Sequence, residues 1–424
     1  MLLVKSAKKD MLRKLQYKGN VKKQRVALFL LLAYVVLVTS GFENVNWNPT
    51  YGGWVTNIVS LGLLGYLLYS RPKGKQFHFR TLVLFLIWVP FVSILNSWSI
   101  YSQSPSRSFL LMTTQATWVI YFLLHKYKVQ EQVVLKVFFY IALFLVGIQI
   151  VQQFTYPNAP FGTMSLEVMI EKNAAEAAEQ RNGLWRFRMH QNGYYTAPIL
   201  FAMWIWIRKI SSPKLVIFVV LFFASIYLTL TRQVMFACIL AVFCSMFMGQ
   251  KKINFTALFI GLIFIAGLYA YYDVLFSKLA QQTQEDSNED NVRLLAASML
   301  WNESLKTPLT FLFGYGLPDS TSAYGLYMYK LQSFFGVFTS DVGFIGQIFE
   351  RGFIYVCICY YMLYKLFFKF KKVIPMYIRM FVMFAGVMSV MIFPCISPTQ
   401  TVVWAMLLYV CDLHINKSIL ALKS

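Results

Sequence analysis

Long apolar segments recur along this chain, at intervals of about 20 to 40 residues, and they limit the folds open to it. Hydrophobic residues occupy 58% of its 424 positions. A helix needs about 20 residues to cross a hydrocarbon core about 30 Å thick, and it satisfies its own backbone groups there. The sequence therefore predicts an all-α, polytopic integral membrane protein.

Twelve of these segments are predicted to be transmembrane helices. They cover residues 26–42, 52–70, 81–100, 109–124, 134–154, 193–207, 215–230, 234–249, 253–272, 341–364, 375–393 and 400–413. Residues 1–25 form a basic tail before the first span, and residues 26–424 form a single membrane domain.

The connections between the predicted spans alternate in charge. One set carries 28 of the 39 basic residues and three of the 17 acidic residues. The positive-inside rule places this set, with both termini, in the cytoplasm. Basic residues that set the membrane orientation and contact anionic lipid head groups then explain the net charge of +22. Nucleic acid is therefore not an expected partner.

Two outer connections, 155–192 and 273–340, are much longer than the others, and long loops in compact proteins are usually functional or disordered. Composition indicates ordered loops with short helices over 165–180 and 291–305. One face of the second helix is predicted to carry Leu294, Ser298, Trp301 and Leu305.

Arginine is enriched on the outer side, where it supplies seven of 11 basic residues, against six of 28 inside. Its planar guanidinium can donate two parallel hydrogen bonds to two oxygens of a phosphate. Arginines backed by loop tyrosines suit a lipid-linked diphosphate that carries a sugar, whereas ordinary salt bridges with the 14 outer acidic residues are the alternative. The outer arginines are Arg107, Arg181, Arg186, Arg188, Arg232, Arg293 and Arg351.

Two of these arginines lie close to predicted spans. Arg232 lies in the short turn between the seventh and eighth spans, where a charge needs a partner. Phosphate is one candidate, and a carboxylate such as Asp341 or Glu350 is the other. Arg351 follows Glu350 inside the predicted tenth span, so an ion pair between these neighbours is the alternative to phosphate binding.

Two residues are candidates for a general base. Asp341 begins the predicted tenth span, where it is either a helix N-cap or the acceptor of a proton from an attacking sugar hydroxyl. His190 is the only outer histidine, and its ordinary pKa suits acid–base chemistry, although a structural hydrogen bond is the commoner role. The six cysteines lie in or beside spans without metal-ligand spacing, so no metal or cofactor is expected.

Short motifs follow one another in a characteristic order at the outer ends of the spans. They are Arg186-Phe187-Arg188 with His190-Gln191-Asn192, Thr231-Arg232, Arg293 with Trp301 and Pro308, Gly314-Tyr315-Gly316, Ser340-Asp341-Val342-Gly343, and Glu350-Arg351-Gly352. This order resembles the superfamily of O-antigen polymerases (Wzy) and O-antigen ligases (WaaL). Ligases of that superfamily typically have a His-Asn pair where this chain has Ser340-Asp341, which looks more like the polymerase pattern.

The resemblance implies a metal-independent glycosyltransferase of the bacterial inner membrane. It would join undecaprenyl-diphosphate-linked repeat units into O-antigen, capsule or exopolysaccharide on the outer face, with a chain-length regulator protein as a further partner. The implied catalytic residues are Asp341, Arg232 and His190, and the implied diphosphate and glycan contacts are Arg186, Arg188, Arg293, Arg351 and Tyr315. An O-antigen ligase and a lipid-linked sugar flippase or transporter are the alternatives, and the long outer loops and scarce charge within the spans disfavour a transporter.

Overall fold

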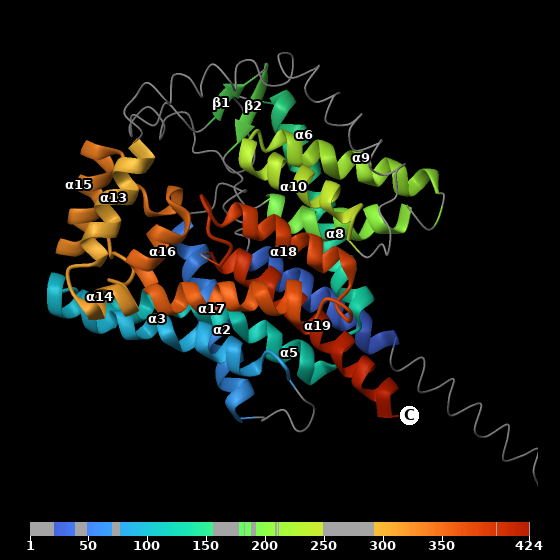
Figure 1. Ribbon diagram of the computed structural model, residues 1–424, viewed down its shortest axis with the longest axis horizontal. Helices are drawn as coiled ribbons and strands as arrows, with labels where there is room; N and C mark the ends of the chain where they lie inside the picture. The colour runs from blue at the N-terminus through green and yellow to red at the C-terminus, as the bar shows by residue number, and fades with distance from the viewer. Residues whose placement is uncertain are drawn as a thin grey trace, which may run out of the picture.

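Helices form nearly all of the regular structure in this protein. A computed structural model describes residues 21–38, 49–69, 77–155, 178–181, 183–187, 192–207, 210, 212–248, 292–395 and 397–423. The predicted ninth span, 253–272, lies outside the described residues. Within them the strands are β1 (Ala178–Arg181) and β2 (Leu184–Phe187), which pair as an antiparallel hairpin (Figure 1).

Three helices of the described part are long and apolar enough to cross a membrane: α3 (Arg80–Tyr101), α6 (Glu131–Thr155) and α19 (Pro398–Lys423). They give the protein the character of a membrane protein. The first described helix covers residues 21–38, and further apolar helices accompany the three long ones. These are α2 (Pro49–Tyr69), α8 (Asn192–Ile207), α9 (Pro213–Leu228), α10 (Arg232–Ser245) and α18 (Met376–Met388).

The predicted span 109–124 is not one continuous α-helix. It divides into α4 (Pro105–Met112), a 3-10 helix η2 (Thr113–Trp118) and α5 (Val119–Tyr127). Threonine hydroxyls tighten this segment, since Thr113 donates to the Leu110 carbonyl at 2.5 Å and Thr117 to the Thr114 carbonyl at 2.9 Å. Such side chains compete locally with the regular helical pattern.

The predicted span 341–364 is also interrupted. It divides at Gly352 into α16 (Gly343–Arg351) and α17 (Phe353–Tyr364), which continues into a π-helical turn η4 (Lys365–Lys369). Gly352 has φ 88° and ψ 162°, a conformation open essentially to glycine alone. A Cβ atom at Gly352 would lie 2.2 Å from the carbonyl oxygen of Leu312, because α14 (Pro308–Phe313) passes against the break.

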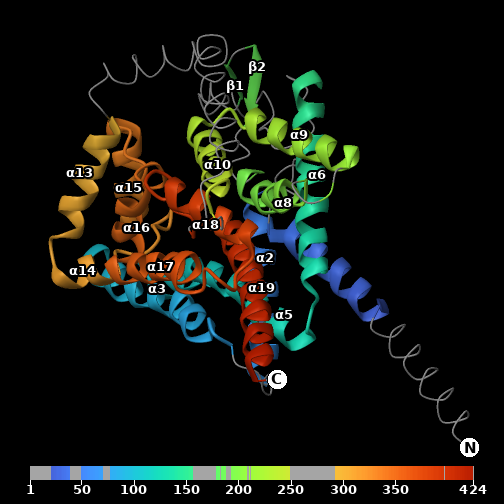
Figure 2. The ribbon, with the colours of Figure 1, turned by 45° about the vertical axis from the view of Figure 1, so that its right-hand side comes forward.

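The second long loop folds around its own small core. The predicted helix over 291–305 is confirmed as α13 (Val292–Ser304), and α15 (Ala323–Phe335) lies beside it (Figures 1 and 2). The buried face is a different one from the face that carries Leu294, Ser298, Trp301 and Leu305, because α13 buries Ala296, Leu300 and Ser304, while Leu294 and Leu305 are exposed. The helix packs against α16, a long-range contact that periodicity alone does not specify.

The first long loop differs from its prediction where it is described. Of the predicted helix over 165–180, residues 178–180 belong to strand β1, and the rest lies outside the described residues. Gln153 at the end of α6 accepts a 2.9 Å hydrogen bond from the Trp185 amide and donates one of 2.5 Å to its carbonyl. These two bonds attach β2 to α6, so tertiary contacts favour strand structure at this point.

Segments that were predicted to share the cytoplasmic side meet at one end of the protein. The buried Asp412 of α19 accepts hydrogen bonds from the His125 ring at 3.0 Å, the His78 amide at 3.1 Å and the Tyr121 hydroxyl. His414 lies 2.9 Å from Glu131. Figures 1 and 2 show this end of α19 turned away from both the β1–β2 hairpin and α13.

Candidate functional site

Arg293 and residues close in sequence to Arg232 and Asp341 contact Met391, which lies in the loop after α18. The Gln233 side chain donates to Met391 Sδ, and Arg293 Nη1 donates to the same sulfur at 3.8 Å. The Gly343 amide donates to the Met391 carbonyl oxygen at 3.0 Å. This loop therefore joins α10, α13 and α16, which carry Arg232, Arg293 and the segment after Asp341.

Arg232 is the first residue of α10, directly before Gln233. The preceding turn is tight, and its Leu230 is fully buried with φ 46°, in the left-handed region. A non-glycine residue holds such a conformation only where surrounding contacts impose it, and strained backbone often occurs at functional sites. The fold thus fixes the backbone of Arg232 at the N-terminal end of α10, where backbone amides favour an anion.

Arg293 lies in the first turn of α13 and is exposed. Ala296 and Leu300 on the same helix belong to the small core of the second loop and set the helix against α16. The exposed guanidinium can therefore reach a ligand while its helix stays anchored. The position of Arg293 therefore fits an anion-binding role.

Asp341 is exposed at the end of a 3-10 turn, η3 (Thr339–Asp341), and its carboxylate accepts a 3.1 Å hydrogen bond from Ser340. It is not the N-cap of the following helix, since that position is Val342. Gly343 has φ 52°, and a Cβ atom there would lie 2.2 Å from the Val390 carbonyl oxygen. This close contact holds the Asp341 segment beside the Met391 loop and leaves the carboxylate open to solvent or ligand.

Arg351 is buried, with 2% of its surface exposed. Its guanidinium donates to Gln347 Oε1 and lies 5.5 Å from the centre of the Tyr355 ring. Gln347 donates in turn to Glu350 at 3.2 Å, so the amide bridges the two charged side chains. The Gln347 amide thus connects Arg351 with Glu350, and in this conformation the Arg351 side chain is packed inside the protein.

Tyr315 is also an interior residue, with 1% of its surface exposed. Its hydroxyl donates to the Glu303 carbonyl at 2.9 Å, and its amide donates to the Phe349 carbonyl at 2.7 Å. Its ring packs against Tyr101 and Phe349. Tyr315 therefore joins α13, α16 and α3, its ring is covered in this conformation, and the glycan contact stays a prediction.

The remaining predicted residues belong to the first long loop. Arg186 lies on β2, where the register pairs it with Glu179. Arg188 and His190 lie outside the described residues, so their predicted roles stay predictions.

The described part of the second long loop carries its own charged contacts. Arg107, after α3, lies 3.7 Å from Asp319, and Lys306 lies 2.8 Å from Glu303. The Thr321 amide and hydroxyl and the nearby Arg107 together hold the pKa of Asp319 below its ordinary value, against the opposing effect of burial. Hydrogen bonding to Glu303 raises the pKa of Lys306. These two contacts close this part of the loop locally.

Sequence reasoning missed the residues that assemble this region. Met391 and Gln233 had no motif of their own, and Gln103 and Gln153 lie at the ends of apolar helices. Gln103 donates to the Leu317 carbonyl at 2.9 Å and accepts from the Asp319 amide at 2.9 Å. An amide side chain at the end of an apolar helix could have indicated Gln103 and Gln153, because such a group needs a hydrogen-bond partner.

The fold defines a helical protein of membrane character in which α10, α13 and α16 meet at the Met391 loop. In the part of the chain that the structure describes, no group of three or more His, Cys, Asp or Glu side chains is placed to hold a metal ion. Searches find no protein-family model that matches the chain and no curated protein that matches it.

Proposed function

We propose that this protein is a polysaccharide polymerase of the bacterial inner membrane, an integral-membrane glycosyltransferase that joins undecaprenyl-diphosphate-linked repeat units. The observation that carries the proposal is the convergence of α10, α13 and α16 on Met391. An arginine, a neighbour of a second arginine and an exposed carboxylate segment meet there, although they are far apart in sequence. The motif order of the sequence supplies the substrate class.

The arginines have an electrostatic role in the proposed reaction. A donor chain lies with its diphosphate near Arg232, and Arg186 and Arg188 belong to the same outer side. Arg293 holds the diphosphate of the acceptor unit beside it. Positive charge placed in advance stabilises the diphosphate as it leaves with the electron pair of the glycosidic bond.

Asp341 acts as the general base in this scheme, with His190 as the second candidate. The acceptor hydroxyl oxygen attacks the anomeric carbon of the donor and forms the new glycosidic bond, while the bond from that carbon to the diphosphate oxygen breaks. The hydroxyl proton passes to the Asp341 carboxylate. The exposure of that carboxylate and its single 3.1 Å contact with Ser340 support the role, because a base must be able to reach its substrate.

We further propose that the chain crosses the membrane twelve times with both termini in the cytoplasm. The described contacts support this topology, since segments assigned to the same side meet one another. Asp412 contacts His125 and His78 at one end, whereas Arg107 contacts Asp319 in the outer loop. The interruptions at η2 and Gly352 would then lie within spans that remain buried in protein, where broken helices are tolerated.

Substitutions on the arginines test the proposal directly. Arg293→Ala and Arg232→Ala should each lower the rate of polymerisation about 100-fold or more. Arg232→Lys keeps the charge without the planar fork and should shorten the polymer. Arg107→Ala is the matched control, because it is an exposed outer arginine that lies beside Asp319 instead of Met391. Normal polymer in both Arg232 variants would show that the phosphate role is wrong.

The base is tested by Asp341→Asn, which should lower the rate by about 100-fold or more while the protein remains folded. Deletion of the gene, followed by gel analysis of the surface glycan, separates the alternatives. A polymerase loss leaves single repeat units attached without a ladder. Polymer stranded on its lipid carrier would instead indicate a ligase, and repeat units retained on the cytoplasmic face would indicate a flippase.

A further inference from the structure

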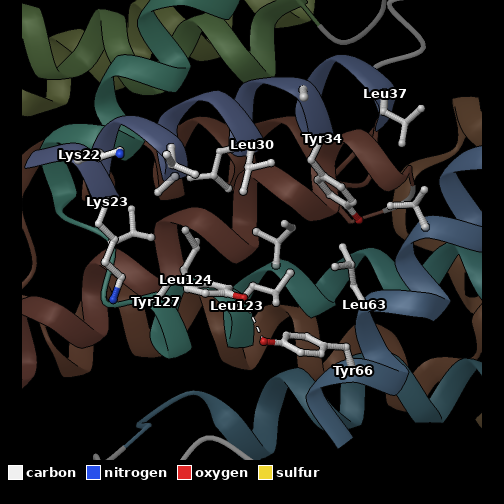
Figure 3. A pocket seen from close by; sticks show the side chains of 17 residues that line it. Lys22, Lys23, Leu30, Tyr34, Leu37, Leu63, Tyr66, Leu123, Leu124 and Tyr127 are labelled. Atoms are coloured by element: carbon white, nitrogen blue, oxygen red, sulfur yellow. Dashed lines mark hydrogen bonds between the residues drawn. The ribbon is translucent and has the colours of Figure 1, made fainter. Parts of the chain in front are cut away.

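An apolar groove of about 810 Å³ lies between the helix over residues 21–38, α2 and α5 (Figure 3). Its volume is within the range of about 300–1,000 Å³ that is usual for small-molecule sites. The wall consists mainly of aliphatic side chains from the three helices. They include Leu30, Leu37, Leu63, Leu123 and Leu124.

One end of this groove is basic. Lys22 and Lys23 line that end and are exposed (Figure 3). The ammonium of Lys126 lies 3.6 Å from the centre of the ring of Tyr66, which lines the groove. No Asp or Glu is among the described residues that line the groove. The chemistry therefore fits an occupant with a long apolar body and an anionic end.

Hydrogen bonds at both ends hold the groove in shape. Gln24, beside the two lysines, donates to the Lys128 carbonyl at 3.3 Å and accepts from the Gln130 amide at 3.0 Å. Toward the other end, the hydroxyls of Tyr34 and Ser60 lie 2.8 Å apart. A groove whose walls are fixed in this way binds with a smaller ordering cost than a mobile one.

The groove is open along one side. Val26 and Leu30 on its wall are 51% and 60% exposed, and in a membrane helix such apolar surface faces lipid. From Lys22 to Leu37 the helix rises about 22 Å, at 1.5 Å per residue. That length exceeds half of a hydrocarbon core about 30 Å thick, so an acyl chain from one leaflet can lie along it.

We propose that the groove is a binding site for one anionic glycerophospholipid. Its phosphate lies at Lys22 and Lys23, and one acyl chain extends along the leucine wall toward Leu37. The positive-inside rule explains lysines on this side of the protein in general, but it does not place them at the mouth of an apolar groove. The site is independent of the proposed glycosyltransferase activity, because it is formed by other helices.

Native mass spectrometry of the full chain in detergent tests the site, with phosphatidylglycerol and phosphatidylcholine of identical acyl chains as probes. One phosphatidylglycerol should be retained in preference to phosphatidylcholine. A lysine near an anionic lipid surface contributes roughly fivefold in affinity, so Lys22→Ala/Lys23→Ala should weaken phosphatidylglycerol binding about 25-fold. Lys371→Ala/Lys372→Ala is the matched control and should have no effect, because these lysines are exposed on the same side but do not line the groove.

Filling the groove gives an independent measurement. Ala33→Trp should abolish phosphatidylglycerol retention at an unchanged midpoint of thermal unfolding, because Ala33 lines the groove. Ala33→Leu is the second variant, to be used where the tryptophan prevents folding, and it should weaken phosphatidylglycerol retention. Equal retention of the two lipids would overturn the proposal. Equal losses in the two double-lysine variants would do so as well, since they would indicate annular lipid only.

Discussion

Gly352 separates α16 from α17 and is the position at which a single added methyl group should be most disruptive. The change is Gly352→Ala. At φ 88° and ψ 162° a non-glycine residue is strained, and such strain costs about 1–3 kcal/mol. The added Cβ would also lie 2.2 Å from the Leu312 carbonyl oxygen and 2.4 Å from the Phe313 Cα, both of them backbone atoms.

The two effects add because they have different origins. Backbone atoms cannot rotate away as a side chain does, so α14 must move to relieve the contact, and overpacking of this kind costs about 1–3 kcal/mol. We expect a total loss of about 3–5 kcal/mol in the free energy of unfolding, at the high end for single substitutions. At ~2 °C per kcal/mol, the unfolding midpoint should fall by about 6 °C or more.

Thermal unfolding of the purified protein in detergent measures this effect, at one scan rate for all variants. Gly386→Ala in α18 is the matched control. Among the described residues, no heavy atom apart from the backbone of its own helical turn and its two chain neighbours lies within 4 Å of the added Cβ. Alanine also favours a helix over glycine by about 1 kcal/mol. Its midpoint should stay equal or rise slightly. Equal midpoints for the two variants would refute the reasoning about the break.

Two further predictions concern charged groups near the outer loops. Gln347→Leu removes the bridge between the buried arginine and glutamate of α16 and should cost about 3 kcal/mol of stability; a loss below about 1 kcal/mol would speak against the network. Because the pKa of Asp319 is lowered, its contribution to loop stability is complete above the ordinary Asp value and is lost as pH falls through the lowered value. Hydrogen exchange of residues 316–322 should therefore quicken in acid beyond its intrinsic pH dependence, and Asp319→Asn should remove that excess, whereas a persisting excess in the variant would assign it to another group.

The candidate site was only partly predictable from the sequence. Excess arginine in the outer connections was visible as a composition difference, and it directed attention to Arg293. The same signal also selected Arg351, whose side chain the fold buries. Residue type shows what a side chain can bind, but the accessibility of that side chain depends on which helices pack over it.

The helix interruptions could not be predicted from hydropathy, for a similar reason. The apolar run over 341–364 reads as continuous, because hydropathy sums the transfer preferences of separate residues. The break at Gly352 depends on the Leu312 carbonyl, 40 residues earlier in the chain. The glycines of this segment are therefore compatible with a continuous helix and with an interrupted one, and the sequence alone does not distinguish the two.

The sequence by itself determined the membrane character of the protein, the helix over 292–304 and the types of side chain present in its outer loops. These properties follow from local hydrophobicity, helix periodicity and charge, which each segment carries with it. Only the tertiary structure decided that α10, α13 and α16 meet at Met391, that Tyr315 and Arg351 are interior, and that a groove opens beside Lys22. Such features arise from packing between distant segments, because close packing selects one arrangement of helices whose separate sequences allow many.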